Sequence, residues 1–243
     1  MSRWIDRRCT VQCLLGAVGC VVVALSATQL GAAASPKKPP APAPDLVQKH
    51  TAADTSRAQS VLPGLVDFGP GWSASAASVA ESSLTCPGSR PKFPGVIETG
   101  AATSDSFQRS PTGPFVAGSA WLYKSTGDAA TVWGKAVGPR LLGCFVQSVK
   151  QGSTNRVTFT IATTGAAPMP HLAERTAAYR VRATARSAGQ TTTAYYVLIV
   201  LGARNGIAEL TMARFGAPVS SATEVSLARM VARRLAALPD PGR

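Results

Sequence analysis

Histidine and cysteine, which carry much of the nucleophilic and metal chemistry of proteins, are scarce in this sequence. Its 243 residues include two histidines and five cysteines. The sequence has no CxxC, HxH or HExxH spacing, whereas a zinc site needs three or four ligands, commonly at recurring spacings of this kind. We therefore expect no metal ion, and no sequence pattern points to a cofactor.

Catalytic patterns are missing as well. A nucleophilic cysteine needs a histidine base within reach, but His50 lies in a proline-rich region and His171 in the loop APMPHLAER. The sequence has no GxSxG pattern and no glycine-rich phosphate loop after a strand. A secreted hydrolase in which His171 pairs with Asp105 or Asp128 is the less favoured alternative. We expect no catalytic residue, and we predict that the protein is not an enzyme.

Acidic residues are few, with 12 Asp and Glu against 25 Lys and Arg, which gives a formal net charge of +13. Such an excess suits anionic surroundings, for example cell-wall polymers, lipid headgroups or nucleic acid. The preferred explanation is solubility together with a high-GC genome, which favours arginine and alanine. No basic stretch is interleaved with aromatics, so we expect no nucleic acid partner. The expected partner is an unidentified small molecule or envelope component, for which an anionic character would match the charge.

The first 34 residues have the pattern of a secretory signal peptide. Arginines at positions 3, 7 and 8 precede an apolar run, which ends in small residues at Ala32, Ala33 and Ala34. A basic head, an apolar middle and an Ala-x-Ala end are typical of these peptides, and we expect cleavage after Ala34. The sequence therefore predicts a secreted, extracytoplasmic protein.

Two other interpretations of this segment remain open. Residues 11–30 carry no charge and reach the roughly 20 residues that a membrane-spanning helix needs, so an uncleaved membrane anchor is one alternative. The stretch AVGC at positions 17–20 loosely matches a bacterial lipobox with Cys20 as the acylated residue, although the apolar run continues past it. We expect membrane contact only if this segment is retained.

The rest of the chain divides into a linker and one domain. Residues 35–52 contain five prolines between Pro36 and Pro44, together with alanine and lysine and no aromatic residue. Such a segment cannot bury a core, so we expect an extended, solvated linker. Residues 53–239 have the length of one ordinary domain and are enough for a substantial hydrophobic core.

Two cysteines, Cys86 and Cys144, remain after the signal segment. In an exported domain, which folds in an oxidising compartment, two cysteines most often form one disulfide. Helical spacing places Cys144 on the apolar side of its helix, where a reactive thiol would be shielded from solvent. We therefore predict a Cys86–Cys144 disulfide.

Helical patterns occur in three regions. The first is residues 51–62. The second is residues 125–152, with Ser125 or Thr126 as the N-cap and an interruption at Gly138–Pro139, because proline clashes with the preceding helical turn. The third is residues 222–238, which we expect to begin with a capping box of Ser221 and Glu224.

Strand patterns fill the remaining regions. They cover residues 96–108, 114–125, 155–164, 177–189 and 190–216, the last with a predicted type I′ turn at Asn205–Gly206. Short turns join the strands, so neighbouring strands should be antiparallel. The element order predicts an α+β fold, in which an antiparallel sheet of about five to six strands has its helices packed mainly on one face.

Alternation along residues 177–189 places Arg180, Arg182 and Arg186 on one face of their strand. This face could recognise an anionic ligand, with Arg204 or Arg214 joining it across the sheet; a solvated outer face is the alternative interpretation. Residues 195–201, YYVLIVL, are apolar on both sides and could line a cavity. Such a cavity would serve the alternative function, a carrier of an apolar or lipid ligand at the envelope, but the preferred interpretation of this pattern is an ordinary core strand.

The order of these features resembles a known group of exported domains. The elements that carry the resemblance are the FGPGW turn, Cys86 in a loop, Trp133 and Cys144 on one helix, the Asn-Gly hairpin and the terminal VARRLAAL helix. Over residues 55–238 they resemble actinobacterial PknH-like extracellular sensor domains and the related Mog1/PsbP-like exported proteins. The sequence departs from the kinase sensors, since it has no kinase domain and one cysteine pair instead of two. The resemblance implies a non-enzymatic, sensor-like binding domain with a ligand cleft.

Overall fold

The structure, a computed structural model, describes residues 45–76, 91–153 and 157–239. The predicted signal peptide, most of the predicted linker and Cys86 lie outside these residues. No helix within the described part is long and apolar enough to cross a membrane.

Within the described residues, nine strands form one sheet. Seven of them follow the order β1-β3-β5-β9-β8-β7-β6, while β2 pairs with β4 and β4 pairs with β5. All the pairs are antiparallel except β1 and β3, which run parallel. The strands are β1 (Val47–Gln48), β2 (Ser73–Ser75), β3 (Ile97–Thr103), β4 (Ser106–Gln108), β5 (Phe115–Tyr123), β6 (Val157–Ala166), β7 (Arg175–Ser187), β8 (Gln190–Ala203) and β9 (Gly206–Phe215).

The α+β class is confirmed, but the prediction of five to six antiparallel strands is wrong in number and in direction. The extra strands are short: β1 has two residues, and β2 and β4 have three each. A segment of this length shows no alternation of polar and apolar residues. β1 also lies in residues that the composition assigns to the linker, and it is the strand that makes the sheet mixed.

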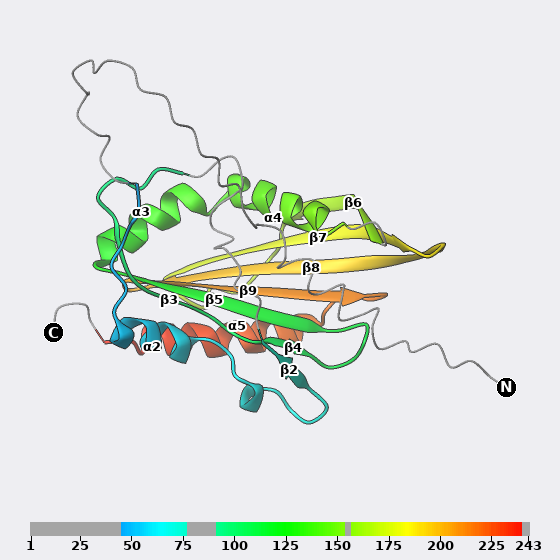
Figure 1. Cartoon of the computed structure of the whole chain (residues 1–243), viewed down its shortest axis with the longest axis horizontal. Helices are drawn as coiled ribbons and strands as arrows, with labels where there is room; N and C mark the ends of the chain where they lie inside the picture. Colours follow the sequence, from blue (N-terminus) through cyan, green and yellow to red (C-terminus); the bar gives the residue numbers. More distant parts are fainter. Residues whose placement is uncertain (1–44, 77–90, 154–156, 240–243) are drawn as a thin grey trace, which may run out of the picture.

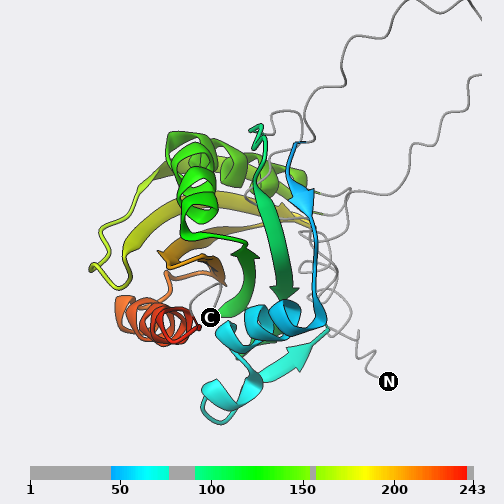
Figure 2. The ribbon, with the colours of Figure 1, turned by 90° about the vertical axis from the view of Figure 1, so that its left-hand side faces the viewer.

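Helices cover both faces of the sheet, so the prediction that they lie mainly on one face is also wrong. α2 (Ala52–Val61) and α5 (Ser221–Ala236) pack on one face, which we call the α5 face. α3 (Thr126–Ala136) and α4 (Pro139–Gln151) pack on the other, the α4 face. Figure 2 shows the sheet between these two pairs of helices.

The composition of the central strands explains why two layers of helices are needed. On β5, Ala120 and Leu122 belong to the core under α2 and α5, whereas Trp121 and Tyr123 belong to the core under α3 and α4. A strand with large apolar side chains on both sides is stable only if both sides are covered. Residues 197–201 of β8 divide between the two cores in the same way.

The helix ends follow the sequence in most places. Ser125 caps α3 and accepts a hydrogen bond from the backbone N–H of Asp128. α3 ends at Ala136, and α4 begins at Pro139, as the Gly138–Pro139 pair predicts. At α5, however, the N-cap is Ser220, not Ser221, and the predicted capping box with Glu224 does not form.

The β8–β9 hairpin forms, but its turn is one residue earlier than predicted. Ala203 pairs with Gly206, so the two turn residues are Arg204 and Asn205, and the positive φ of 51° falls on Arg204. Gly206 starts β9, where a Cβ atom would lie 2.6 Å from Cδ1 of Leu235. The glycine therefore lies outside the two-residue turn, where it allows the Leu235 side chain of α5 to pack closely on β9.

Candidate functional site

Among the described residues, helices cover the α5 face of the sheet only along part of its length. Where α5 lies, the strands present apolar side chains such as Ala178, Val197 and Ile199, which belong to the same core as Leu227 and Ala228 of the helix. Strands β7 and β8 continue well past the end of α5 (Figure 1). The change from apolar to polar side chains along these strands coincides with the end of the helical cover.

The residues beyond α5 form three cross-strand rows of polar side chains. Directly paired residues of neighbouring strands point to the same side of a sheet, and successive rows lie about 6.8 Å apart. The rows are Thr163, Arg182, Tyr195 and Arg214; Thr160, Thr184 and Thr193; and Thr158, Arg186 and Thr191. We call this surface the basic face.

The arginines of the basic face have no acidic partner in the part of the chain that the structure describes. Arg182 and Arg186 are exposed, and Arg214 is half-buried, with Nη1 donating to the backbone oxygen of Pro218 at 3.4 Å. Among the described residues, no carboxylate forms an ion pair with any of the three. Tyr195 lies between Arg182 and Arg214 in its row, so two guanidinium groups flank one aromatic ring across three neighbouring strands.

Arg180, which the sequence places with Arg182 and Arg186, lies at the boundary instead. Its Nη2 atom donates to Oε2 of Glu224 on α5 at 2.6 Å, and the Glu224 side chain is 2% exposed. The ion pair neutralises Arg180, so this arginine adds little positive potential to the basic face. Of the two arginines considered as additions, Arg214 joins the face, whereas Arg204 lies in the β8–β9 turn at the opposite end of the strands.

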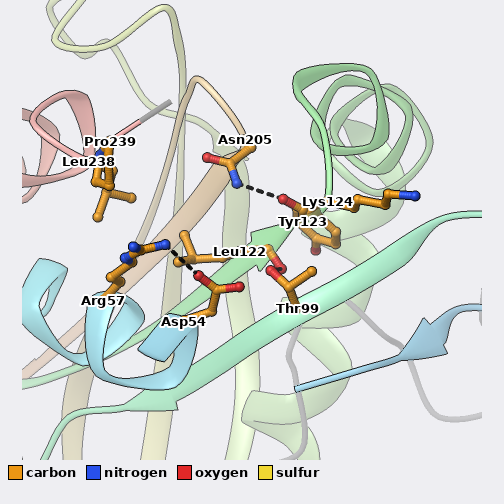
Figure 3. Close-up of a pocket in the computed structure, with 9 residues that line it drawn as sticks. All are labelled: Asp54, Arg57, Thr99, Leu122, Tyr123, Lys124, Asn205, Leu238 and Pro239. Carbon is orange, nitrogen blue, oxygen red and sulfur yellow. Dashed lines mark hydrogen bonds and ion pairs between the residues drawn. The ribbon is translucent and has the colours of Figure 1, made fainter. Parts of the chain in front are cut away.

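A small pocket lies at that opposite end (Figure 3). Its volume is about 180 Å³, and α2, β3, β5, the β8–β9 turn and the residues after α5 contribute to its wall. The Asp54–Arg57 ion pair, at 2.9 Å, forms one side. Asn205 donates through Nδ2 to the backbone oxygen of Tyr123 at 2.6 Å. Sequence reasoning missed this pocket because its residues come from distant segments and share no motif. It is smaller than the roughly 300–1,000 Å³ of most ligand pockets.

A buried carboxylate holds β1 against β3. The Glu98 residue is 4% exposed, and its Oε1 atom lies 2.7 Å from Nε2 of His50 and accepts from Nε2 of Gln48 at 3.3 Å. Burial of the Tyr123 hydroxyl, together with the negative charge of Glu98, raises the pKa of Tyr123 far above its usual range. The side chains of Gln48 and His50 provide polar partners for the buried Glu98 carboxylate, which indicates a structural role at this edge of the sheet.

The residues considered for hydrolysis are not assembled. His171 is exposed in the loop between β6 and β7, and no hydrogen bond or ion pair joins it to the other described residues. Asp105 follows β3, and Asp128 lies in the first turn of α3, where its backbone is bound to the Ser125 cap. Within the described residues, no group of three or more histidine, cysteine, aspartate or glutamate side chains could hold a metal ion.

Cys144 lies on α4 and is 5% exposed, on the side of the helix that packs against the sheet. This burial agrees with the helical pattern of the sequence. Cys86 lies outside the described residues, so the Cys86–Cys144 disulfide stays a prediction.

No protein-family model and no curated protein matches this chain. Among solved structures, the extracellular domain of PknH from Mycobacterium tuberculosis is similar at 12% sequence identity and a TM-score of 0.38, over 74% of this chain and 95% of that chain. LpqN, described as involved in cell envelope biogenesis of Mycobacterium tuberculosis, is similar at 15% identity and a TM-score of 0.29, over 70% of this chain and 78% of that chain. Scores this low support no conclusion about function, so the proposals below rest on the residues themselves.

Proposed function

We propose that this protein is an exported, non-enzymatic binding domain of the bacterial cell envelope, and that it holds an anionic ligand against the basic face. The observation that carries the proposal is the group of unbalanced arginines, Arg182, Arg186 and Arg214, on a rigid sheet. The signal-peptide pattern of residues 1–34 supports the extracytoplasmic location.

The basic face has the chemistry that an anionic ligand needs. A guanidinium group binds carboxylate or phosphate through two parallel hydrogen bonds. The threonine hydroxyls of the three rows can donate to or accept from a ligand. The Tyr195 ring offers an apolar surface between Arg182 and Arg214. Because central strands of one sheet hold these side chains, binding requires little ordering of the backbone.

Titration with a labelled polyanion, for example fluorescent dextran sulfate, tests the proposal. The variant carries three changes, Arg182→Gln, Arg186→Gln and Arg214→Gln. We expect its Kd to rise by about tenfold or more, because each lost charge contact contributes a factor of several. The dependence of the Kd on salt concentration should also become shallower, since fewer counterions are displaced.

A matched control removes the same amount of charge elsewhere. Lys49, Arg109 and Lys150 are exposed and lie outside the basic face, so changing all three to glutamine should alter the Kd by less than about twofold. Equal weakening in both variants would mean that the polyanion responds to net charge alone, and the proposed site would then be wrong.

A further inference from the structure

A second feature of the α5 face is an apolar tip formed by Leu65 and Val66. Among the described residues these are the exposed large hydrophobic side chains, at 44% for Leu65 and 94% for Val66. They lie in the short 3-10 helix η1 (Leu65–Asp67), which follows α2. In Figure 1 this segment lies below α5, at the lower edge of the molecule. The tip therefore lies at the surface of the molecule, where Val66 is almost fully exposed.

The tip is held rigidly from beneath. Oδ2 of Asp67 accepts from the backbone N–H of Gly64 at 2.8 Å. Arg234 of α5 donates to both carboxylate oxygens of Asp67, at 2.6 and 2.9 Å, and to the backbone oxygen of Leu62 at 2.9 Å. On the other side of the turn, the ring of Phe68 packs against Trp72 and Phe107, with centroids 4.4 and 4.7 Å apart. Two apolar side chains are thus fixed in an exposed position, although burial would be more favourable.

Positive charge lies on α5, the helix that holds the tip in place. The acid next to the tip, Asp67, is neutralised by Arg234. Arg229 and Arg233 of the same helix are exposed, and they are four positions apart, which places them on one side of α5. Arg233 precedes Arg234 in the helix, but the two side chains point about 100° apart, so Arg229 and Arg233 lie on the outer side of α5, away from its buried residues. An apolar projection, together with exposed cations on the outer side of the helix that holds it, matches an anionic lipid surface, which offers hydrocarbon behind a layer of negative charge.

We propose that Leu65 and Val66 insert into an anionic lipid bilayer while Arg229 and Arg233 contact its headgroups. This site is separate from the basic face and goes beyond ligand binding there. A bilayer suits the tip better than a protein partner does, because the tip is convex and has two apolar side chains. A stable protein interface instead needs about 800 Å² on each partner, with an apolar centre.

The test measures whether position 66 moves from water into the bilayer, by the fluorescence of a dye attached there. An azide-bearing amino acid at position 66 of the full chain, coupled to an environment-sensitive dye, leaves the five cysteines unmodified. The same label at Ala130, which is exposed on α3 on the other face, is the control. Vesicles contain either equal parts of phosphatidylglycerol and phosphatidylcholine or phosphatidylcholine alone. With the anionic vesicles, we expect a blue shift and quenching by nitroxide-labelled lipid at position 66 and neither change at position 130.

The charge contribution is tested on the same labelled chain. Changing Arg229→Glu and Arg233→Glu should weaken the response at position 66 by about tenfold or more, since each arginine near such a surface contributes a factor of about five. Pure phosphatidylcholine should give a similarly weak response.

Three results would overturn the proposal. A label at position 66 that stays in water on both kinds of vesicle would exclude insertion and leave a protein partner as the occupant. Equal responses at positions 66 and 130 would mean that the N-terminal segment alone brings the chain to the vesicles. Equal responses on charged and neutral vesicles would exclude the role of the arginines. Loss of Arg182 and Arg186 should leave the response at position 66 unchanged, which separates this proposal from the anion-binding function.

Discussion

Arg180 on β7 and Glu224 on α5 form an ion pair of very unequal exposure. Their Nη2 and Oε2 atoms are 2.6 Å apart, and the side chain of Arg180 is 42% exposed while that of Glu224 is 2% exposed. The pair lies where α5 stops covering the sheet, between the apolar core and the basic face. Burying an unpaired carboxylate would cost on the order of several kcal/mol of folding free energy. The ion pair with Arg180 offsets this cost, so Glu224 can be buried near the start of α5.

This asymmetry predicts unequal effects when each partner is removed. Arg180→Gln leaves a buried carboxylate without its cation, and we expect the free energy of unfolding to fall by about 3 kcal/mol. Glu224→Gln keeps an oxygen that can accept from Arg180, whose guanidinium group also reaches water, so the loss should be about 1 kcal/mol. Urea denaturation of the two variants at neutral pH measures both values.

Arg182→Gln is the matched control for these variants, because Arg182 is exposed two positions further along the same strand. It should change the free energy of unfolding by less than about 0.5 kcal/mol. If Glu224→Gln proved as harmful as Arg180→Gln, the unequal burial of the pair would not determine its energetics.

Sequence patterns predict the direction of each side chain on β7, but not the partner that each one meets. Alternation places Arg180 and Arg182 on the same face, and the structure agrees. What separates them is Glu224, 44 positions away, whose contact depends on how α5 lies across the sheet. The spacing of Ser221 and Glu224 also matches a local capping box. Glu224 instead forms the long-range ion pair with Arg180.

The sequence also indicates that helices cover both faces of the sheet, but only once the strands with two apolar sides are known to be central. Leu122 and Trp121 lie on opposite sides of β5, and both are buried. A two-sided apolar strand indicates two helical layers. The order of helices along the chain does not say which layer each joins, since α2 and α5, at the two ends of the described chain, share a face. The pocket and the Leu65–Val66 tip depend on such long-range packing and could not be predicted.

The predicted disulfide can be tested by mass spectrometry of the protein from its own host. Alkylation without reduction should leave Cys86 and Cys144 unmodified, and a proteolytic digest should contain their peptides as one linked species. Reduction should lower the free energy of unfolding by about 2–5 kcal/mol, the usual range for small secreted domains. Alkylation of either thiol in the unreduced, denatured protein would contradict the prediction.

Asp67 predicts a pH dependence of stability. The hydrogen bonds from Arg234 hold the pKa of the Asp67 carboxyl below its ordinary value of 3.8. A group with a lowered pKa in the folded state stabilises the fold above its unfolded pKa, and this contribution disappears as the pH falls through the folded pKa. Asp67→Asn should therefore cost about 1–2 kcal/mol at neutral pH, and the difference from the unchanged protein should shrink below about pH 3.8. Denaturation curves at neutral and acid pH measure this difference; a constant difference would exclude the charge as its origin.

At Gly100 of β3, the backbone of α2 approaches the sheet closely. A Cβ atom at this position would lie 2.5 Å from the carbonyl carbon of Asp54 and 2.6 Å from its oxygen. Both are backbone atoms, so the contact can be relieved only by moving the helix. Gly100→Ala should therefore lower the free energy of unfolding by about 2 kcal/mol or more.

The control is Gly134 on α3, where an added Cβ atom would meet nothing within 4 Å. Gly134→Ala should stabilise the protein by about 0.5–1 kcal/mol, because alanine loses less conformational entropy in a helix. Thermal and urea unfolding of the two variants measure these opposite shifts. A Gly100→Ala variant as stable as the unchanged protein would mean that α2 does not pack this closely on β3.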